Sequence, residues 1–197
     1  MTALRKTITR DDILDLETYE VERPQRRARL REIKRNRRVE VGPCATFYFE
    51  SYDTMLHQVH EMLRIEKGGD EQLLEELSAY NPLIPQGRDL VATLMFEIDD
   101  EVRRDRMLRQ LTHVENTVYL DIGGKRIAAR AEDEVERTKE DGKTSSIHFL
   151  HFDLSDEDAS AFKAGTVPVS LGIAHDAYPH QAGLTPSVRA ALSGDLA

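Results

Sequence analysis

Cysteine, tryptophan and long apolar runs are almost or wholly absent from this sequence of 197 residues. The single cysteine, Cys44, excludes an internal disulfide and any zinc or iron–sulfur site that needs two cysteines from one subunit. No electropositive setting can be identified near it, so we expect a buried structural thiol rather than a nucleophile. No run of about 20 apolar residues and no signal-peptide core is found, which predicts a cytoplasmic protein without a membrane span.

The sequence also lacks the short motifs of well-known catalytic sites. It contains no serine nucleophile elbow, no phosphate-binding loop and no dinucleotide-binding glycine pattern. Its glycine pairs have simpler explanations, because Gly123-Gly124 suits a hairpin turn and Gly68-Gly69 suits the end of a helix. The sequence motifs therefore identify no reaction. The content of 40% hydrophobic and 32% charged residues indicates a globular fold.

Charge is abundant and unevenly spread. The formal net charge is -9, yet residues 23–38 hold nine of the 27 Lys and Arg and one of the 36 Asp and Glu. We therefore divide the chain into an N-terminal helical segment with a basic arm, residues 1–38, and an α+β domain, residues 39–197. No aromatic residue for base stacking lies in the arm, so docking onto an acidic surface of the same chain or of a second subunit is favoured over nucleic acid. The candidate binding residues are Arg26, Arg27, Arg31, Lys34, Arg35 and Arg38.

Helix and strand patterns alternate along the chain. Helices are expected at residues 10–20, 24–38, 51–67, 70–80, 99–111, 155–165 and 184–196. Strands are expected at residues 39–50, 89–98, 145–154 and 166–174, with a hairpin at 117–131 and loops at 132–144 and 174–183. This order predicts an α+β fold that has a mixed or antiparallel sheet with helices packed mainly on one side.

The stretch 51–69 places three candidate metal ligands, His57, His60 and Glu61, within one helical turn. On a helical wheel the apolar stripe of this helix leaves His57 on the outer face and His60 on one flank. Helix faces of this kind are ordinarily charged and solvated, so pairing of Glu61 with Arg64 or His57 is favoured over a metal site.

Other carboxylates and histidines are better placed to gather at one edge of the sheet. Glu50 and Glu97 end two predicted strands, and Glu66 falls on the apolar side of its helix. His148 alternates with apolar residues, which is typical of a hydrogen-bonded core histidine, whereas His175 lies in an expected loop. The candidate ligands of a divalent transition metal are Glu50, Glu61, Glu66, Glu97, His148 and His175.

Four blocks of sequence carry a resemblance to a known family: "FESYDTMLHQVHEMLRIEK", "YNPLIPQGRDLVATLMFEI", "SSIHFLHFDL" and "GIAHDAYPH". Together they resemble an uncharacterised bacterial family, domain-of-unknown-function family 3501, over nearly the whole chain. Its members often lie beside genes for a rubrerythrin and an iron–sulfur oxidoreductase subunit, which implies a role near redox or peroxide metabolism. The pattern includes Glu50, Glu61, Glu66 and Glu97, but neither His57 nor His60.

Three hypotheses follow. The first is an accessory or binding protein, expected to be a homodimer, that serves a redox or peroxide-defence system through an oxidoreductase partner such as rubrerythrin. The second is a metal-dependent enzyme or metal sensor that uses the carboxylate and histidine candidates. The third is nucleic-acid binding through the basic arm.

Overall fold

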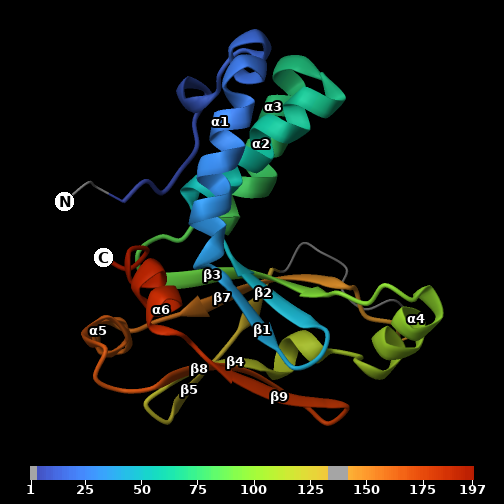
Figure 1. Cartoon of the computed structure of the whole chain (residues 1–197), viewed down its shortest axis with the longest axis vertical. Helices are drawn as coiled ribbons and strands as arrows, with labels where there is room; N and C mark the ends of the chain where they lie inside the picture. The colour runs from blue at the N-terminus through green and yellow to red at the C-terminus, as the bar shows by residue number, and fades with distance from the viewer. Residues whose placement is uncertain (1–3, 133–141) are drawn as a thin grey trace.

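The computed structural model describes residues 4–132 and 142–197 (Figure 1). Its strands are β1 (Arg38–Val41), β2 (Ala45–Phe49), β3 (Asp89–Phe96), β4 (Val118–Ile122), β5 (Lys125–Ala128), β6 (Arg130–Ala131), β7 (Ile147–Asp153), β8 (Val169–His175) and β9 (Tyr178–Gly183). They form a five-stranded sheet in the order β1-β2-β3-β7-β6 and a four-stranded sheet in the order β5-β4-β8-β9, both antiparallel. The predicted α+β class is confirmed, and the antiparallel alternative holds.

Three helices stand side by side at the opposite end of the molecule from the four-stranded sheet (Figure 1). They are α1 (Leu16–Arg35), α2 (Tyr52–Glu66) and α3 (Gly69–Tyr80). The remaining α-helices of the described ranges, α4 (Glu101–Gln110), α5 (Asp156–Ala164) and α6 (Pro186–Ser193), flank the sheets. Short 3-10 helices cover Arg10–Asp12, Asn81–Leu83 and Val114–Thr117. In the described part of the chain, no helix has the length and apolarity needed to cross a membrane.

Strand alternation gives the five-stranded sheet two different faces. Its inner face packs against the four-stranded sheet and supplies Phe47, Leu94 and Phe152 to the main hydrophobic cluster. Its outer face carries the alternate residues, among them Thr93 on β3, which pairs in register with Tyr48 on β2 and Phe149 on β7. The register therefore brings polar and aromatic side chains together on the outer face.

Helices α2 and α3 cover part of this outer face through a second, smaller hydrophobic cluster. Met55 and Val59 of α2 belong to it, together with Val91 of β3. Ser51 begins α2 as its N-cap, because its side chain accepts from the backbone N–H of Thr54 while the Thr54 hydroxyl accepts from the backbone N–H of Ser51. The junction between helices and sheet is thereby fixed close to the end of β2.

The N-terminal helices differ from the prediction. Instead of two helices, at residues 10–20 and 24–38, one continuous helix runs from Leu16 to Arg35, and only a 3-10 turn precedes it. Pro24 lies inside this helix, where it removes one backbone hydrogen bond. Because Pro24 is exposed, water can satisfy the carbonyl group that loses its partner, and the helix continues through the proline. The prediction had instead started a new helix at Pro24.

Two strand predictions were also wrong. Residues 39–50 form a hairpin of β1 and β2 rather than one strand, and Gly42 supplies the left-handed backbone, with φ of 71°, that the turn requires. The expected loop at 174–183 contains β9, which pairs with β8 as an exposed edge strand. Its small and polar residues hide the strand pattern. Most of the loop expected at 132–144, residues 133–141, lies outside the described residues.

Candidate functional site

A cavity of about 270 Å³ opens where α1, α2 and α3 meet the outer face of the five-stranded sheet. We call it the sheet–helix pocket. Polar and apolar groups from seven elements, and Glu50 from the segment between β2 and α2, converge on it, which is the usual composition of a small-molecule site. Its lining residues are Lys34, Tyr48, Glu50, Thr54, Met55, Gln58, Tyr80, Leu83, Thr93, Met95, Ile147 and Phe149.

Glu50 is the buried charged group of this pocket, with 9% of its surface exposed. The Thr54 hydroxyl donates to Oε2 of Glu50 at 2.6 Å, and the Thr93 hydroxyl donates to Oε1 at 2.7 Å. A carboxylate oxygen has room for more than one donor, so each oxygen retains accepting capacity after these bonds. The two threonines come from different elements, α2 and β3, and together they fix the orientation of the carboxylate.

The backbone and side chains behind Glu50 are equally constrained. The backbone N–H of Glu50 donates to the carbonyl of Val91, which continues the β2–β3 ladder by one residue. Arg37 donates from Nη1 to the carbonyl of Glu50 at 3.2 Å, and its two terminal nitrogens both bind the carboxylate of Asp195 at 2.7 Å. Burial raises the pKa of Asp195, while the Arg37 guanidinium opposes this rise. Arg37 is thus committed to Asp195 and to backbone, not to the Glu50 side chain.

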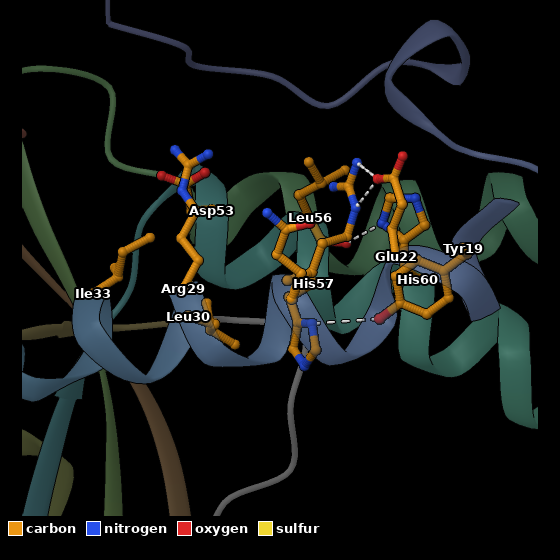
Figure 2. A pocket seen from close by; sticks show the side chains of 11 residues that line it. Tyr19, Glu22, Arg29, Leu30, Ile33, Asp53, Leu56, His57 and His60 are labelled. Carbon is orange, nitrogen blue, oxygen red and sulfur yellow. Dashed lines mark hydrogen bonds and ion pairs between the residues drawn. The ribbon is translucent and has the colours of Figure 1, made fainter.

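A second cavity, of about 380 Å³, lies between α1 and α2 (Figure 2). We call it the interhelical pocket. Beside it, Arg23 of α1 binds both carboxylate oxygens of Glu61 of α2, at 2.7 and 2.8 Å, and the Tyr19 hydroxyl donates to Glu61 Oε1 at 2.6 Å. The bonds from Arg23 lower the pKa of Glu61 to about 2. Burial and the adjacent carboxylate raise the pKa of Tyr19. This network is an ion pair that joins two helices. The predicted partners were wrong, because Arg23 of α1 binds Glu61 and Arg64 pairs with Glu20 instead.

The two histidines of α2 are less exposed than the helical wheel predicted, because α1 covers their face. His60 is 3% exposed and stacks on Tyr19 with ring centroids 4.6 Å apart. Its Nδ1 donates to the carbonyl of Leu56, and its Nε2 accepts from the backbone N–H of Leu14, an arrangement of the neutral ring. His57 is half-buried, with Nδ1 3.4 Å from the Tyr19 hydroxyl (Figure 2). Burial lowers the pKa of both rings.

The six candidate metal ligands lie in separate environments. Glu97 accepts from the hydroxyls of Thr46 and Tyr48, on the same sheet face as Glu50 but outside the pocket. Glu66 is exposed near the end of α2 and accepts from Gln72 at 3.2 Å. Within residues 4–132 and 142–197, no group of three or more His, Cys, Asp or Glu side chains is arranged to hold a metal ion.

The two histidines of the candidate set each contact backbone carbonyls. His148 is buried in the inner face of the five-stranded sheet, and its Nε2 lies 2.9 Å from the carbonyl of Ser145. Its Nδ1 lies 3.9 Å from Glu115 Oε2, another buried carboxylate. His175 ends β8 with its Nε2 3.2 Å from the carbonyl of Thr112. Neither imidazole is among the residues that line the sheet–helix pocket.

The six candidate binding residues, five in α1 and Arg38 at the start of β1, fall into two groups. Arg26 pairs with Glu22, Arg35 lies 3.7 Å from Glu32, and Arg38 reaches Glu40 and Glu97. The other three candidates form no ion pair with any described residue and follow one flank of the helix at i, i+4 and i+7. They are Arg27, Arg31 and Lys34, and Lys34 also lines the sheet–helix pocket.

Residues 7–196 match the family described as "Protein of unknown function (DUF3501)". The chain belongs to the DUF3501 family. A crystal structure titled as a novel protein of unknown function from Burkholderia pseudomallei K96243 is 40% identical to it. The match covers 97% of this chain and 100% of that chain, with a TM-score of 0.90. No match was found among curated proteins.

Sequence reasoning on this DUF3501 chain selected Glu50 but missed the groups that hold it. Alternation along β3 places Thr93 on the polar side of the strand, so its presence on the outer face was predictable. The contact of Thr54 with Glu50 was not predicted, because a threonine in the first turn after Ser51 is explained by helix capping alone. Tyr19 and Arg23 were missed because their partner, Glu61, is about 40 residues away in sequence.

Proposed function

We propose that this DUF3501 protein binds a small organic molecule in the sheet–helix pocket, with Glu50 as the polar anchor. The observation that carries the proposal is a carboxylate that is 9% exposed, oriented by two threonine hydroxyls, and directed into a cavity of about 270 Å³. A buried polar group held in one orientation by its neighbours is what a specific binding site requires. Glu50 would accept hydrogen bonds from a donor group of the ligand.

The walls of the pocket favour a ligand with an apolar part next to that donor. Met55, Leu83, Met95 and Phe149 contribute apolar surface, and the rings of Tyr48 and Tyr80 add flat faces with a polar edge. Methionine side chains adapt to irregular ligands because they are flexible and polarisable. The ligand is therefore expected to bury a hydrocarbon or aromatic portion while its donor group reaches Glu50.

Ligand-observed NMR with a library of small fragments tests this proposal. Fragments that bind the wild-type protein should lose about tenfold or more in affinity for Glu50→Gln, because the variant replaces a charged acceptor by a neutral amide. Glu97→Gln is the matched control, since Glu97 also accepts from two hydroxyls on the same sheet face but lies outside the pocket. Binding that is equally weakened in both variants, or unchanged in Glu50→Gln, would contradict the proposal.

A second candidate function is contact with an acidic surface through the flank of α1 formed by Arg27, Arg31 and Lys34. Its support is that these cations form no ion pair with any described residue, in a chain of net charge -9. We favour an acidic surface on a second copy, in a homodimer, over nucleic acid. Sedimentation in low and high salt, with Arg27→Glu/Arg31→Glu as the variant, tests this candidate. A monomer in low salt argues against it, and a gel shift with RNA or DNA would favour the nucleic-acid alternative instead.

We further propose, from the family resemblance, that the bound ligand links this protein to a redox or peroxide-defence system with an oxidoreductase partner. A rubrerythrin or an iron–sulfur protein is the partner expected from that resemblance. Affinity purification of the full chain from its native cell extract would test the link. Recovery of no redox protein, in an extract where such proteins are detectable, would count against it.

A further inference from the structure

We infer that the ligand of the sheet–helix pocket carries a primary ammonium group, which binds the carboxylate of Glu50. This inference rests on the proposed function and adds the chemical class of the ligand. It begins from the partners of Glu50, which are two neutral hydroxyls, from Thr54 and Thr93. No ion pair joins the Glu50 side chain to any residue of the described ranges.

A buried carboxylate without a cationic partner is costly, because hydroxyl groups replace only part of the stabilisation that water gives to the charge. The nearest guanidinium in the hydrogen-bond network, that of Arg37, cannot supply the missing charge. Its terminal nitrogens bind Asp195, and its bond toward Glu50 goes to the backbone carbonyl. A ligand cation would therefore meet a preoriented acceptor with unused capacity.

The walls of the pocket, in addition to the carboxylate of Glu50, suit a cationic ligand. The aromatic side chains of Tyr48, Tyr80 and Phe149 line the same cavity as Glu50. Aromatic faces attract ammonium groups through the ring quadrupole, and this attraction grows when water is excluded. An ammonium group with a hydrocarbon or aromatic substituent would satisfy both the carboxylate and the apolar wall. A carboxylate or phosphate ligand would instead be repelled by Glu50.

Lys34 is the one basic side chain among the residues that line the pocket, and it allows the sign of the ligand charge to be tested. It is exposed on the last turn of α1 and forms no ion pair with any described residue. For a cationic ligand Lys34 is a weak repulsive neighbour, whereas for an anionic ligand it would be an attractive one. Removing its charge should therefore change affinity in opposite directions for the two classes.

Isothermal titration calorimetry with the full chain and three matched probes, benzylamine, benzyl alcohol and benzoate, tests the inference. Benzylamine should bind about tenfold or more tightly than benzyl alcohol, since a charge-assisted hydrogen bond is roughly twice as strong as a neutral one. Benzoate should bind most weakly. Glu50→Gln should remove the preference for the amine. Lys34→Met should raise benzylamine affinity by about two- to fivefold, the effect of one exposed charge, with Arg31→Met as the control variant that lies outside the pocket.

The outcomes separate this inference from the proposed function. If benzyl alcohol binds as well as or better than benzylamine and still depends on Glu50, the pocket binds ligands but the ammonium class is wrong. If benzoate binds best and Lys34→Met weakens it, the ligand is anionic and the inference is overturned. If none of the probes binds and no library fragment binds, both the inference and the proposed function fail.

Discussion

At the scale of single residues, three glutamates show how partners determine what a carboxylate does. Glu61 receives a guanidinium and a phenol, so its charge is fully compensated and holds two helices together. Glu97 receives two hydroxyls and lies 3.5 Å from Arg38, at a site where water still reaches it. Glu50 receives two hydroxyls where water hardly reaches it, and only this combination leaves a buried charge that a ligand could pair.

The ion pair of Glu61 makes stability depend on pH in a defined direction. Its folded pKa of about 2 is below its ordinary value of 4.5, so the stability it contributes is present above pH 4.5 and is lost as the pH falls toward 2. Glu61→Gln should lower the free energy of unfolding by about 1–2 kcal/mol at pH 7. The difference between wild type and variant should shrink between pH 4.5 and 2, as measured by urea unfolding followed by circular dichroism.

Glu20 provides the control for this measurement, because it also pairs with an arginine between the same two helices. Its partner is Arg64, at 2.7 Å, but its side chain is 47% exposed, compared with 17% for Glu61. Exposed pairs contribute about 0–1 kcal/mol, so Glu20→Gln should have little effect at any pH. Equal losses in the two variants, or a constant loss from Glu61→Gln across the pH range, would show that the pair does not act as described.

At the scale of elements, local patterns predicted what is determined locally. The Gly123-Gly124 hairpin is present, with positive φ at both glycines, and the strand at 89–98 and the helix after Ser51 were also predicted. The β1–β2 turn and the edge strand β9 were not predicted, because tertiary contacts hold them. The sheet–helix pocket could not be predicted from the sequence for the same reason. Its residues could be placed on faces, but α1 comes close to Glu50 only through the packing of whole elements.

Tyr178 makes such a tertiary contact with the β1–β2 turn. Its hydroxyl accepts from the backbone N–H groups of Cys44 and Ala45, both at 3.0 Å, and donates to the carbonyl of Val41 at 2.8 Å. One side chain of β9 thus ties the β1–β2 turn to the four-stranded sheet. Tyr178→Phe should lower the free energy of unfolding by about 2–4 kcal/mol, since buried backbone groups lose their partner. Chemical denaturation measures the loss.

Tyr119→Phe is the matched control in the same sheet. The Tyr119 hydroxyl donates one partly buried bond, to Gln181 at 2.9 Å, so the expected loss is about 0.5–1.5 kcal/mol. If the two variants lose equal stability, the three hydrogen bonds of Tyr178 do not hold the β1–β2 turn against the four-stranded sheet as described. The comparison isolates the hydroxyl group because both substitutions keep the ring.

At the scale of the whole molecule, the fold has two hydrophobic clusters of unequal size. The larger one fills the space between the two sheets, and the smaller one joins α2 and α3 to the outer face of the five-stranded sheet. The sheet–helix pocket lies beside the smaller cluster and shares Met55, Leu83 and Phe149 with it. The floor of the pocket is therefore the five-stranded sheet, and its roof consists of α1, α2 and α3. We expect a ligand to enter at this boundary without opening the main core.

Helix α1 should be the first part of this roof to open. Of its 20 residues only Tyr19 and Leu30 are buried, whereas nearly every residue of β3 is buried. In native-state hydrogen exchange we therefore expect the amides of α1 to exchange about 100-fold or more faster than those of β3, because local opening exposes little apolar surface.

Leu30→Ala should accelerate exchange in α1 by a further factor of about 30, from a loss of about 2 kcal/mol, without changing β3. Leu16→Ala is the control, as Leu16 is 41% exposed at the start of the same helix. Equal protection of α1 and β3, or acceleration of both by Leu30→Ala, would mean that helices and sheets unfold as one unit and that the pocket has no separately opening roof.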